Sequence, residues 1–126
     1  MRIEHIALNV PEPAAMASWY AEKLDMRVVD SNDDPPFGQF VADDAGCMLE
    51  LYRNDAFCIP DYANQPPAIV HLAFVSADPP ADAARLVTGG ATLINDETAA
   101  NGSHILTLRD PWGLAIQLCR RTERPS

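Results

Sequence analysis

The chain has 126 residues, enough for one domain or for two very small units that share a core. Its 9 Lys and Arg residues against 18 Asp and Glu residues give a formal net charge of −9, which repels nucleic-acid phosphates and anionic membrane surfaces. Because 48% of the residues are hydrophobic and the longest apolar stretch is too short to span a bilayer, we expect a globular domain that binds neither nucleic acid nor a membrane.

The sequence repeats itself, so its elements come in two matching sets. A shift of 66 residues, from position 5 to position 71, places His5-Ile-Ala-Leu on His71-Leu-Ala-Phe. A shift of 67 places Leu49-Glu50-Leu51 on Ile116-Gln117-Leu118. We therefore expect a single domain over 1–126 that consists of two homologous modules, 1–53 and 68–121, joined by a linker at 54–67.

In the first module, residues 3–9 place apolar side chains on alternate positions, which predicts a half-buried strand. Pro13 follows an acid and suits the first turn of a helix, on which Met16, Trp19 and Tyr20 form an apolar stripe. Three short strands are expected after this helix, at 26–30, 38–42 and 47–52.

The second module predicts the same order. A strand containing His71 precedes a helix that begins at Pro79, carries Leu86 and Val87 on its apolar side, and ends at the glycine pair 89–90. Three strands are expected at 92–95, 104–109 and 114–119. Each module is therefore β-α-β-β-β, and its one helix can cover only one face of a four-stranded sheet.

Tight turns join the last two strands of each module. They read Asp43-Asp44-Ala45-Gly46 and Asp110-Pro111-Trp112-Gly113. An acid in the first position and a glycine in the fourth are typical of type I turns.

Four polar side chains occupy equivalent positions of the repeat, on the face that the helices leave uncovered. They are His5 and His71 on the first strands, and Glu50 and Gln117 among apolar neighbours on the last strands. A carboxylate in an apolar strand must be paired, solvated or metal-bound, because burying it alone costs several kcal/mol. Two imidazoles, a carboxylate and an amide oxygen suit a divalent metal ion.

Each of these residues also has a purely structural interpretation. A single histidine on a strand is more often a hydrogen-bonded residue than a ligand. Glu50 could form an ion pair with Arg53 or Arg27 instead of binding a metal. The equivalent placement of all four side chains in a twofold repeat favours the metal site.

These modules, with the opening His-Ile-Ala-Leu, the second His-Leu-Ala-Phe and the closing Asp-Pro-Trp-Gly-Leu-Ala-Ile-Gln-Leu, resemble the vicinal oxygen chelate superfamily. This group includes glyoxalases, bleomycin resistance proteins and extradiol dioxygenases. The resemblance covers residues 3–120 and implies an α+β fold in which the tandem modules form a curved, cup-like mixed sheet. It also implies a homodimer, with the cup formed within one chain or between two chains.

The same resemblance implies one divalent metal ion, Ni, Zn, Mn, Co or Fe, held by His5, Glu50, His71 and Gln117. Gln117 departs from the family pattern, because glyoxalase I and most metal-dependent relatives have a glutamate there. An amide has no useful basicity, so Glu50 is the only candidate base among the ligands. Members that resemble methylmalonyl-CoA epimerase also combine two His, one Gln and one Glu, but with Gln and Glu in the opposite halves.

Three functions follow from these observations. The preferred one is a metal-dependent, glyoxalase-like lyase or isomerase, in which the ion chelates two adjacent oxygens of a small substrate and Glu50 moves the proton. The second is an Fe(II) extradiol-type dioxygenase that uses His5, His71 and Glu50. The third is a non-catalytic protein of the bleomycin-resistance type that sequesters a small molecule such as an antibiotic, for which the charge of −9 favours a cationic ligand.

Several other residues carry weaker signals. Arg109 and Thr107, on the less apolar face of the penultimate strand, are candidate substrate contacts. The polar loops 31–37 and 95–103 are candidates for substrate selection. His104 is expected to be structural.

The cysteines indicate the compartment rather than the chemistry. Cys47 and Cys119 are expected to be small core residues, with no base placed to activate either thiol. An odd number of cysteines without CxxC spacing, and a first segment unlike a signal peptide, favour the cytoplasm.

Overall fold

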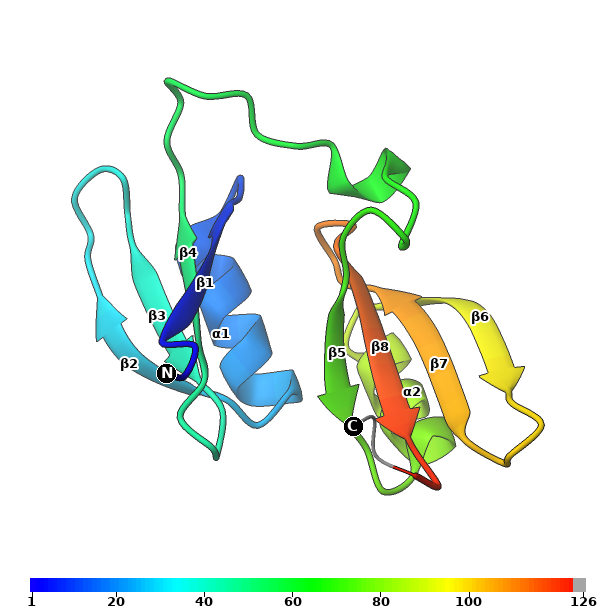
Figure 1. Ribbon diagram of the computed structural model, residues 1–126. Coiled ribbons are helices and arrows are strands. Elements are labelled where there is room, and N and C mark those ends of the chain that lie inside the picture. Colours follow the sequence, from blue (N-terminus) through cyan, green and yellow to red (C-terminus); the bar gives the residue numbers. More distant parts are fainter. Residues whose placement is uncertain (124–126) are drawn as a thin grey trace. The chain divides into compact units, whose positions relative to one another are not determined.

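A computed structural model describes residues 1–123 and divides the chain into two compact units, Met1–Pro60 and Asp61–Ser126. The boundary falls inside the predicted linker (Figure 1). The first unit contains β1 (His5–Asn9), α1 (Pro13–Lys23), β2 (Arg27–Ser31), β3 (Gln39–Ala42) and β4 (Met48–Tyr52). The second contains the 3-10 helix η1 (Tyr62–Asn64), β5 (Leu72–Val75), α2 (Pro79–Thr88), β6 (Thr92–Thr98), β7 (His104–Arg109) and β8 (Ala115–Arg120).

Each unit is a four-stranded mixed sheet with one helix. The strand orders are β1-β4-β3-β2 and β5-β8-β7-β6, so the two sheets have the same topology. The first strand of each unit pairs parallel with the last one, and the remaining pairs are antiparallel. The helix of each unit covers one face of its own sheet (Figure 1). The predicted α+β class and the tandem β-α-β-β-β modules are confirmed, as two separate four-stranded sheets.

Helix α1 forms the core of the first unit, as its apolar stripe predicts. Pro13 stands in its first turn, where the missing N–H of proline costs nothing. Met16 and Tyr20 are fully buried and Trp19 nearly so. These side chains pack on the face of the sheet that carries Leu49 and other buried apolar residues.

Helix α2 plays the same part in the second unit, with one difference from the sequence prediction. Its N-cap residue Asp78 accepts a hydrogen bond from the backbone N–H of Ala81, at 3.2 Å. Leu86 is fully buried, but Val87 is 45% exposed, so its assignment to the apolar stripe was wrong. The two residues are adjacent in sequence and point about 100° apart on a helix, so only one of them faces the sheet.

The two predicted tight turns are confirmed. The N–H of Gly46 donates to the carbonyl of Asp43 at 3.1 Å, and the N–H of Gly113 donates to the carbonyl of Asp110 at 2.9 Å. Both glycines have a positive φ, 88° and 91°. The side chain of each aspartate accepts two further backbone N–H groups of its own turn.

The main deviation from the predicted elements concerns the segment predicted as loop 95–103. Strand β6 continues to Thr98, which pairs with His104 at the start of β7. All seven residues of β6 are exposed, so backbone pairing and not apolar alternation defines the strand. The connecting loop is therefore confined to 99–103.

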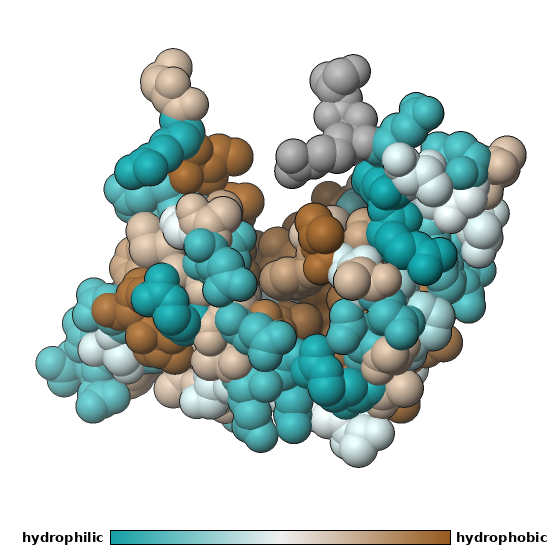
Figure 2. Space-filling model, turned by 90° about the horizontal axis from the view of Figure 1, so that it is seen from below, coloured by the Kyte–Doolittle hydropathy of each residue, from teal (hydrophilic) through white to brown (hydrophobic). Residues whose placement is uncertain are grey.

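Hydrophobic and hydrophilic residues are mixed on the surface (Figure 2). Within residues 1–123, no helix is long and apolar enough to cross a membrane.

Candidate metal-binding site

The pairing of β1 with β4 brings His5 and Glu50 together in the first unit. The parallel register places Ala7 beside Glu50 and His5 beside Met48, so His5 and Glu50 are diagonal neighbours. Leu49 and Leu51, on either side of Glu50, are buried. Because side chains alternate along a strand, Glu50 lies on the face opposite these leucines, as the sequence predicts.

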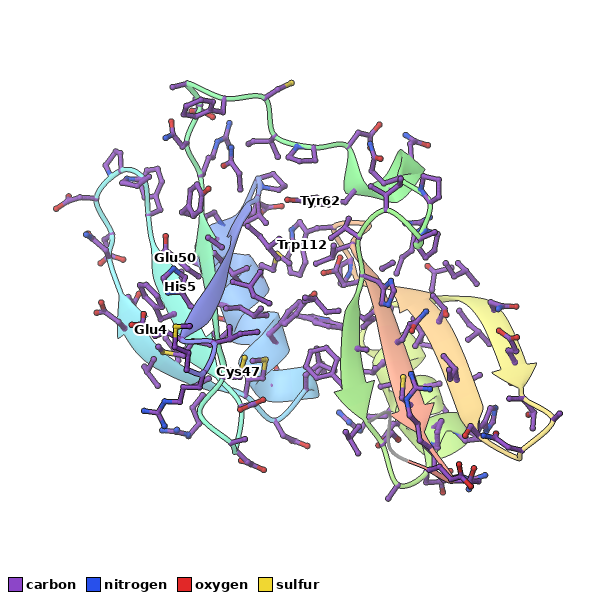
Figure 3. All side chains as sticks on the ribbon, in the orientation of Figure 1. Glu4, His5, Cys47, Glu50, Tyr62 and Trp112 are labelled. Carbon is purple, nitrogen blue, oxygen red and sulfur yellow. The ribbon has the colours of Figure 1, made fainter. Side chains whose placement is uncertain are left out.

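The distance between the two side chains suits a shared metal ion. His5 Nε2 lies 3.8 Å from Glu50 Oε2, which is too long for a hydrogen bond (Figure 3). Metal–ligand distances are about 2.1 Å, so two atoms bound to one ion lie at most about 4.2 Å apart. Both side chains are reachable from solvent, at 35% and 28% exposure.

The other ring nitrogen of His5 is already engaged. Nδ1 of His5 lies 2.9 Å from Oε1 of Glu4. A carboxylate only accepts hydrogen bonds, so Nδ1 is the donor in this contact, which leaves Nε2 as the ring nitrogen that a metal ion can bind. Metal-binding histidines have this arrangement, with one nitrogen on the metal and the other donating to a fixed acceptor.

The second unit repeats the arrangement with different partners. Nδ1 of His71 lies 2.7 Å from the carbonyl oxygen of Pro67, so here too the proton is on Nδ1. Gln117 is half-buried on β8 and pairs in register with Ala73, just as Glu50 pairs with Ala7. His71 itself stands one residue before β5, whereas the sequence predicts it inside the strand. The hydrogen bond to Pro67 fixes its ring in place of strand pairing.

An aromatic side chain also contacts the first pair. The ring of Phe40 meets the imidazole of His5 edge-on, with ring centroids 5.5 Å apart and an interplanar angle of 82°. Phe40 is the register partner of Glu50 on the neighbouring strand β3. The contact of Phe40 with His5 was not predicted, although Phe40 lies in the middle of the predicted strand 38–42.

Arg53, one of the two ion-pair partners considered for Glu50, is engaged elsewhere. Arg53 pairs with Asp55 at 2.9 Å and donates to the carbonyl of Pro11 at 3.1 Å. Among residues 1–123, no three His, Cys, Asp or Glu side chains gather around one point. Of the four predicted ligands, His5 and Glu50 form a close pair in the first unit. His71 and Gln117 occupy the matching positions in the second unit.

A match to a family model shows which family the chain belongs to. The model of a family described as a glyoxalase-like domain matches residues 5–119. The chain belongs to this glyoxalase-like family. No curated protein matches the sequence.

Solved structures share the fold of this glyoxalase-like domain. A glyoxalase family protein from Enterococcus faecalis is similar over 94% of this chain and 97% of its own, with 26% identity and a TM-score of 0.74. An antibiotic binding protein from a Streptomyces species covers 97% of both chains, with 18% identity and a TM-score of 0.75. A glyoxalase I mutant from Zea mays matches 98% of this chain and 47% of its own, with 20% identity and a TM-score of 0.75. The resemblance to the vicinal oxygen chelate superfamily is thus confirmed.

Arg109 of the glyoxalase-like domain binds its own linker. The guanidinium donates from Nη1 to the carbonyls of Tyr62 and Gly113 and from Nη2 to the carbonyl of Gln65, each at 3.0 Å. These bonds hold η1 and the residue after it against the end of β7 within the second unit. Three of the five N–H donors of the guanidinium are therefore directed to backbone carbonyls.

Thr107 has a different position. It is only 4% exposed and is the register partner of Gln117, so the two side chains share one face of the second sheet. His104 has the structural role that the sequence predicts. Its Nε2 lies 2.6 Å from Oδ1 of Asp96, and this contact joins β7 to β6.

The cysteines of the glyoxalase-like domain differ in accessibility. Cys119 is buried, as expected, and burial raises the pKa of its thiol while the nearby Arg121 opposes that shift. Cys47 is only half-buried and Cys58 is exposed. Cys47 was expected in the core, but it follows the β3–β4 turn, where its unit leaves it partly open to solvent.

Proposed function

We propose that this glyoxalase-like domain is a divalent-metal-dependent lyase or isomerase that acts on a small substrate with two adjacent oxygens. His5, Glu50, His71 and Gln117 are the proposed ligands of one ion. The observation that carries the proposal is the state of the histidines: both Nδ1 atoms are engaged, and His5 Nε2 lies 3.8 Å from Glu50. The nitrogen donors of the two histidines and the oxygen donors of Glu50 and Gln117 suit Ni, Zn, Mn, Co or Fe.

A bound divalent ion supplies Lewis-acid polarisation of the substrate oxygens. Glu50 would take the proton from the hydroxyl-bearing carbon next to the substrate carbonyl and deliver it to the carbonyl carbon, while the hydroxyl proton passes to the former carbonyl oxygen. Gln117 cannot do this, because an amide is not a base near neutral pH, so its part is to bind and orient. Phe40 shields one side of His5 from water. Thr107, beside Gln117, is the proposed substrate contact.

The proposal includes the homodimer that the family resemblance implies. Light scattering on the purified protein should give twice the chain mass of 13.7 kDa. A mass equal to one chain contradicts this part of the proposal and leaves the metal chemistry to be judged separately.

Metal content is the decisive measurement. Purified protein should hold one divalent ion per set of four ligands, and Glu50→Gln should lose most of the proton transfer while keeping the fold. Transfer is measured by NMR, as solvent deuterium entering the C–H position of a small α-hydroxycarbonyl compound. Glu22→Gln is the matched control, since it removes the same charge from a glutamate that is 72% exposed on α1. If wild type takes up none of the five metals in stoichiometric amount, the proposal fails.

A sequestering protein is the second candidate. The similar fold of an antibiotic binding protein and the net charge of −9 support a small cationic ligand. Tight binding of a cationic antibiotic by metal-free protein, with no deuterium exchange in the metal-loaded protein, would favour this function over the enzyme.

A further inference from the structure

Among residues 1–123, Glu4 is the one acidic side chain that contacts a proposed metal ligand without being one. It precedes β1 and its side chain is 75% exposed, so no packing requirement explains its position. Its Oε1 nonetheless lies 2.9 Å from Nδ1 of His5. Glu4, His5 and Glu50 lie together in Figure 3. The imidazole of His5 thus has a carboxylate near each ring nitrogen, Glu4 at Nδ1 and Glu50 3.8 Å from Nε2.

The two histidines differ in what holds them. His71 donates from Nδ1 to a neutral backbone carbonyl, that of Pro67, whereas His5 donates to a full negative charge. A charge-assisted hydrogen bond is stronger than a neutral one and pushes electron density toward the opposite ring nitrogen. Nε2 of His5 is therefore a stronger ligand for a cation than Nε2 of His71.

We propose that Glu4 is a positioning residue that orients His5 and strengthens its Nε2 as a metal ligand. This inference rests on the proposed function, because it needs a metal at His5. Glu4 does not touch the metal or the substrate in this proposal. Its carboxylate fixes the rotation of the ring and keeps the proton on Nδ1, so that the lone pair of Nε2 faces Glu50.

The test is metal affinity in two variants of Glu4, measured by competition with a metal-binding dye using Zn²⁺ and Ni²⁺. Removing such a partner of a metal ligand typically costs about 10- to 100-fold in affinity, so Glu4→Ala should weaken binding by at least about tenfold. Glu4→Gln keeps an acceptor for Nδ1–H but loses the charge, so its affinity should lie between wild type and Glu4→Ala. The imidazole nitrogen chemical shifts of His5 in metal-free protein should show the Nδ1–H form in wild type and a mixture in Glu4→Ala.

Glu22→Ala is the matched control. Glu22 is 72% exposed, belongs to the same unit and also contacts its sequence neighbour, with Lys23 Nζ at 3.4 Å. The control removes the same charge, so it reports how much the general negative field contributes to cation binding. Its affinity should stay within about twofold of wild type, and all variants should unfold at the same temperature, because an exposed pair adds little stability.

The outcomes separate the two proposals. If wild type binds the metal and Glu4→Ala binds as tightly as Glu22→Ala, the role of Glu4 is refuted while the metal site stands. If wild type binds no metal, both proposals are overturned. A graded loss from wild type through Glu4→Gln to Glu4→Ala, with unchanged thermal stability, supports both.

Discussion

A Cβ atom at Gly113 would lie 2.6 Å from the Cβ of Ala63, so η1 packs directly on the β7–β8 turn. The backbone atoms of Ala63 would lie at 2.7 Å, and backbone cannot swing aside as a flexible side chain can. Gly113 also has a φ of 91°, a conformation that residues with a Cβ rarely adopt. Two independent constraints thus require glycine at the point where the linker meets the second unit.

We expect Gly113→Ala to lower the free energy of unfolding by about 2–5 kcal/mol, because the backbone strain costs about 1–2 kcal/mol and the overpacking about 1–3 kcal/mol. Urea unfolding followed by circular dichroism measures the change. Gly38→Ala is the control, because no atom lies within 4 Å of a Cβ built there. Equal stability of the two variants would show that η1 does not rest on this turn.

Arg109 holds the same segment by hydrogen bonds to its backbone carbonyls. We expect Arg109→Met to speed amide hydrogen exchange over 61–67, because three carbonyl bonds are lost, and to lower the free energy of unfolding by about 2 kcal/mol. Exchange mass spectrometry reads this segment separately from the sheet. Arg85→Met is the control, since Arg85 is 45% exposed and its ion pair with Asp82 is a surface one. A protected segment in Arg109→Met would contradict the role of the guanidinium.

The repeat made most of the fold predictable from sequence. Pro13 and Pro79 mark the helix starts, because proline fixes a φ that suits the first helical turn. Gly46 and Gly113 mark the strand turns, because glycine readily adopts the positive φ found there. The end of β6 was not predictable. Its last residues are polar and exposed, so the pairing of Thr98 with His104 is decided by backbone geometry that no side-chain pattern records.

The candidate site was also predictable from sequence only in part. The alternation of β4 and β8 predicted that Glu50 and Gln117 each lie opposite the apolar face of their own strand, and the register within each sheet agrees with this. The contacts of the histidine Nδ1 atoms could not be foreseen. Neighbouring residues on a strand point to opposite faces, so a contact between Glu4 and His5 was not expected. Pro67 belongs to the linker, which has no periodic pattern from which its contact with His71 could be predicted.

The repeat also supplies a pair of equivalent aspartates for a stability test. Asp110 Oδ1 accepts the N–H groups of Trp112 and Leu114, and Asp43 Oδ1 accepts those of Ala45 and Cys47. Asp110 is 4% exposed, whereas Asp43 is only half-buried. Water can replace the lost acceptor at the open turn but not at the buried one.

We therefore expect Asp110→Ala to cost about 2–3 kcal/mol of unfolding free energy and Asp43→Ala about 1 kcal/mol. Thermal or urea unfolding of both variants gives the comparison, and each serves as the control of the other. A larger loss in Asp43→Ala would mean that burial does not set the strength of these turns.

The three thiols should react with iodoacetamide in the order of their exposure. Cys58 is exposed, Cys47 half-buried and Cys119 buried with a raised pKa, so Cys58 should be alkylated first and Cys119 last. Peptide mass spectrometry after timed quenching reads each site.

Because burial raises the folded-state pKa of Cys119, the unfolded chain loses this proton at a lower pH than the folded chain. The stability that the neutral buried thiol contributes is complete below the unfolded pKa of about 8.5 and is lost as the pH rises through the folded pKa. Cys119→Ala should consequently flatten the decline of the unfolding free energy above this pH, and an unchanged decline would mean that Cys119 does not cause it.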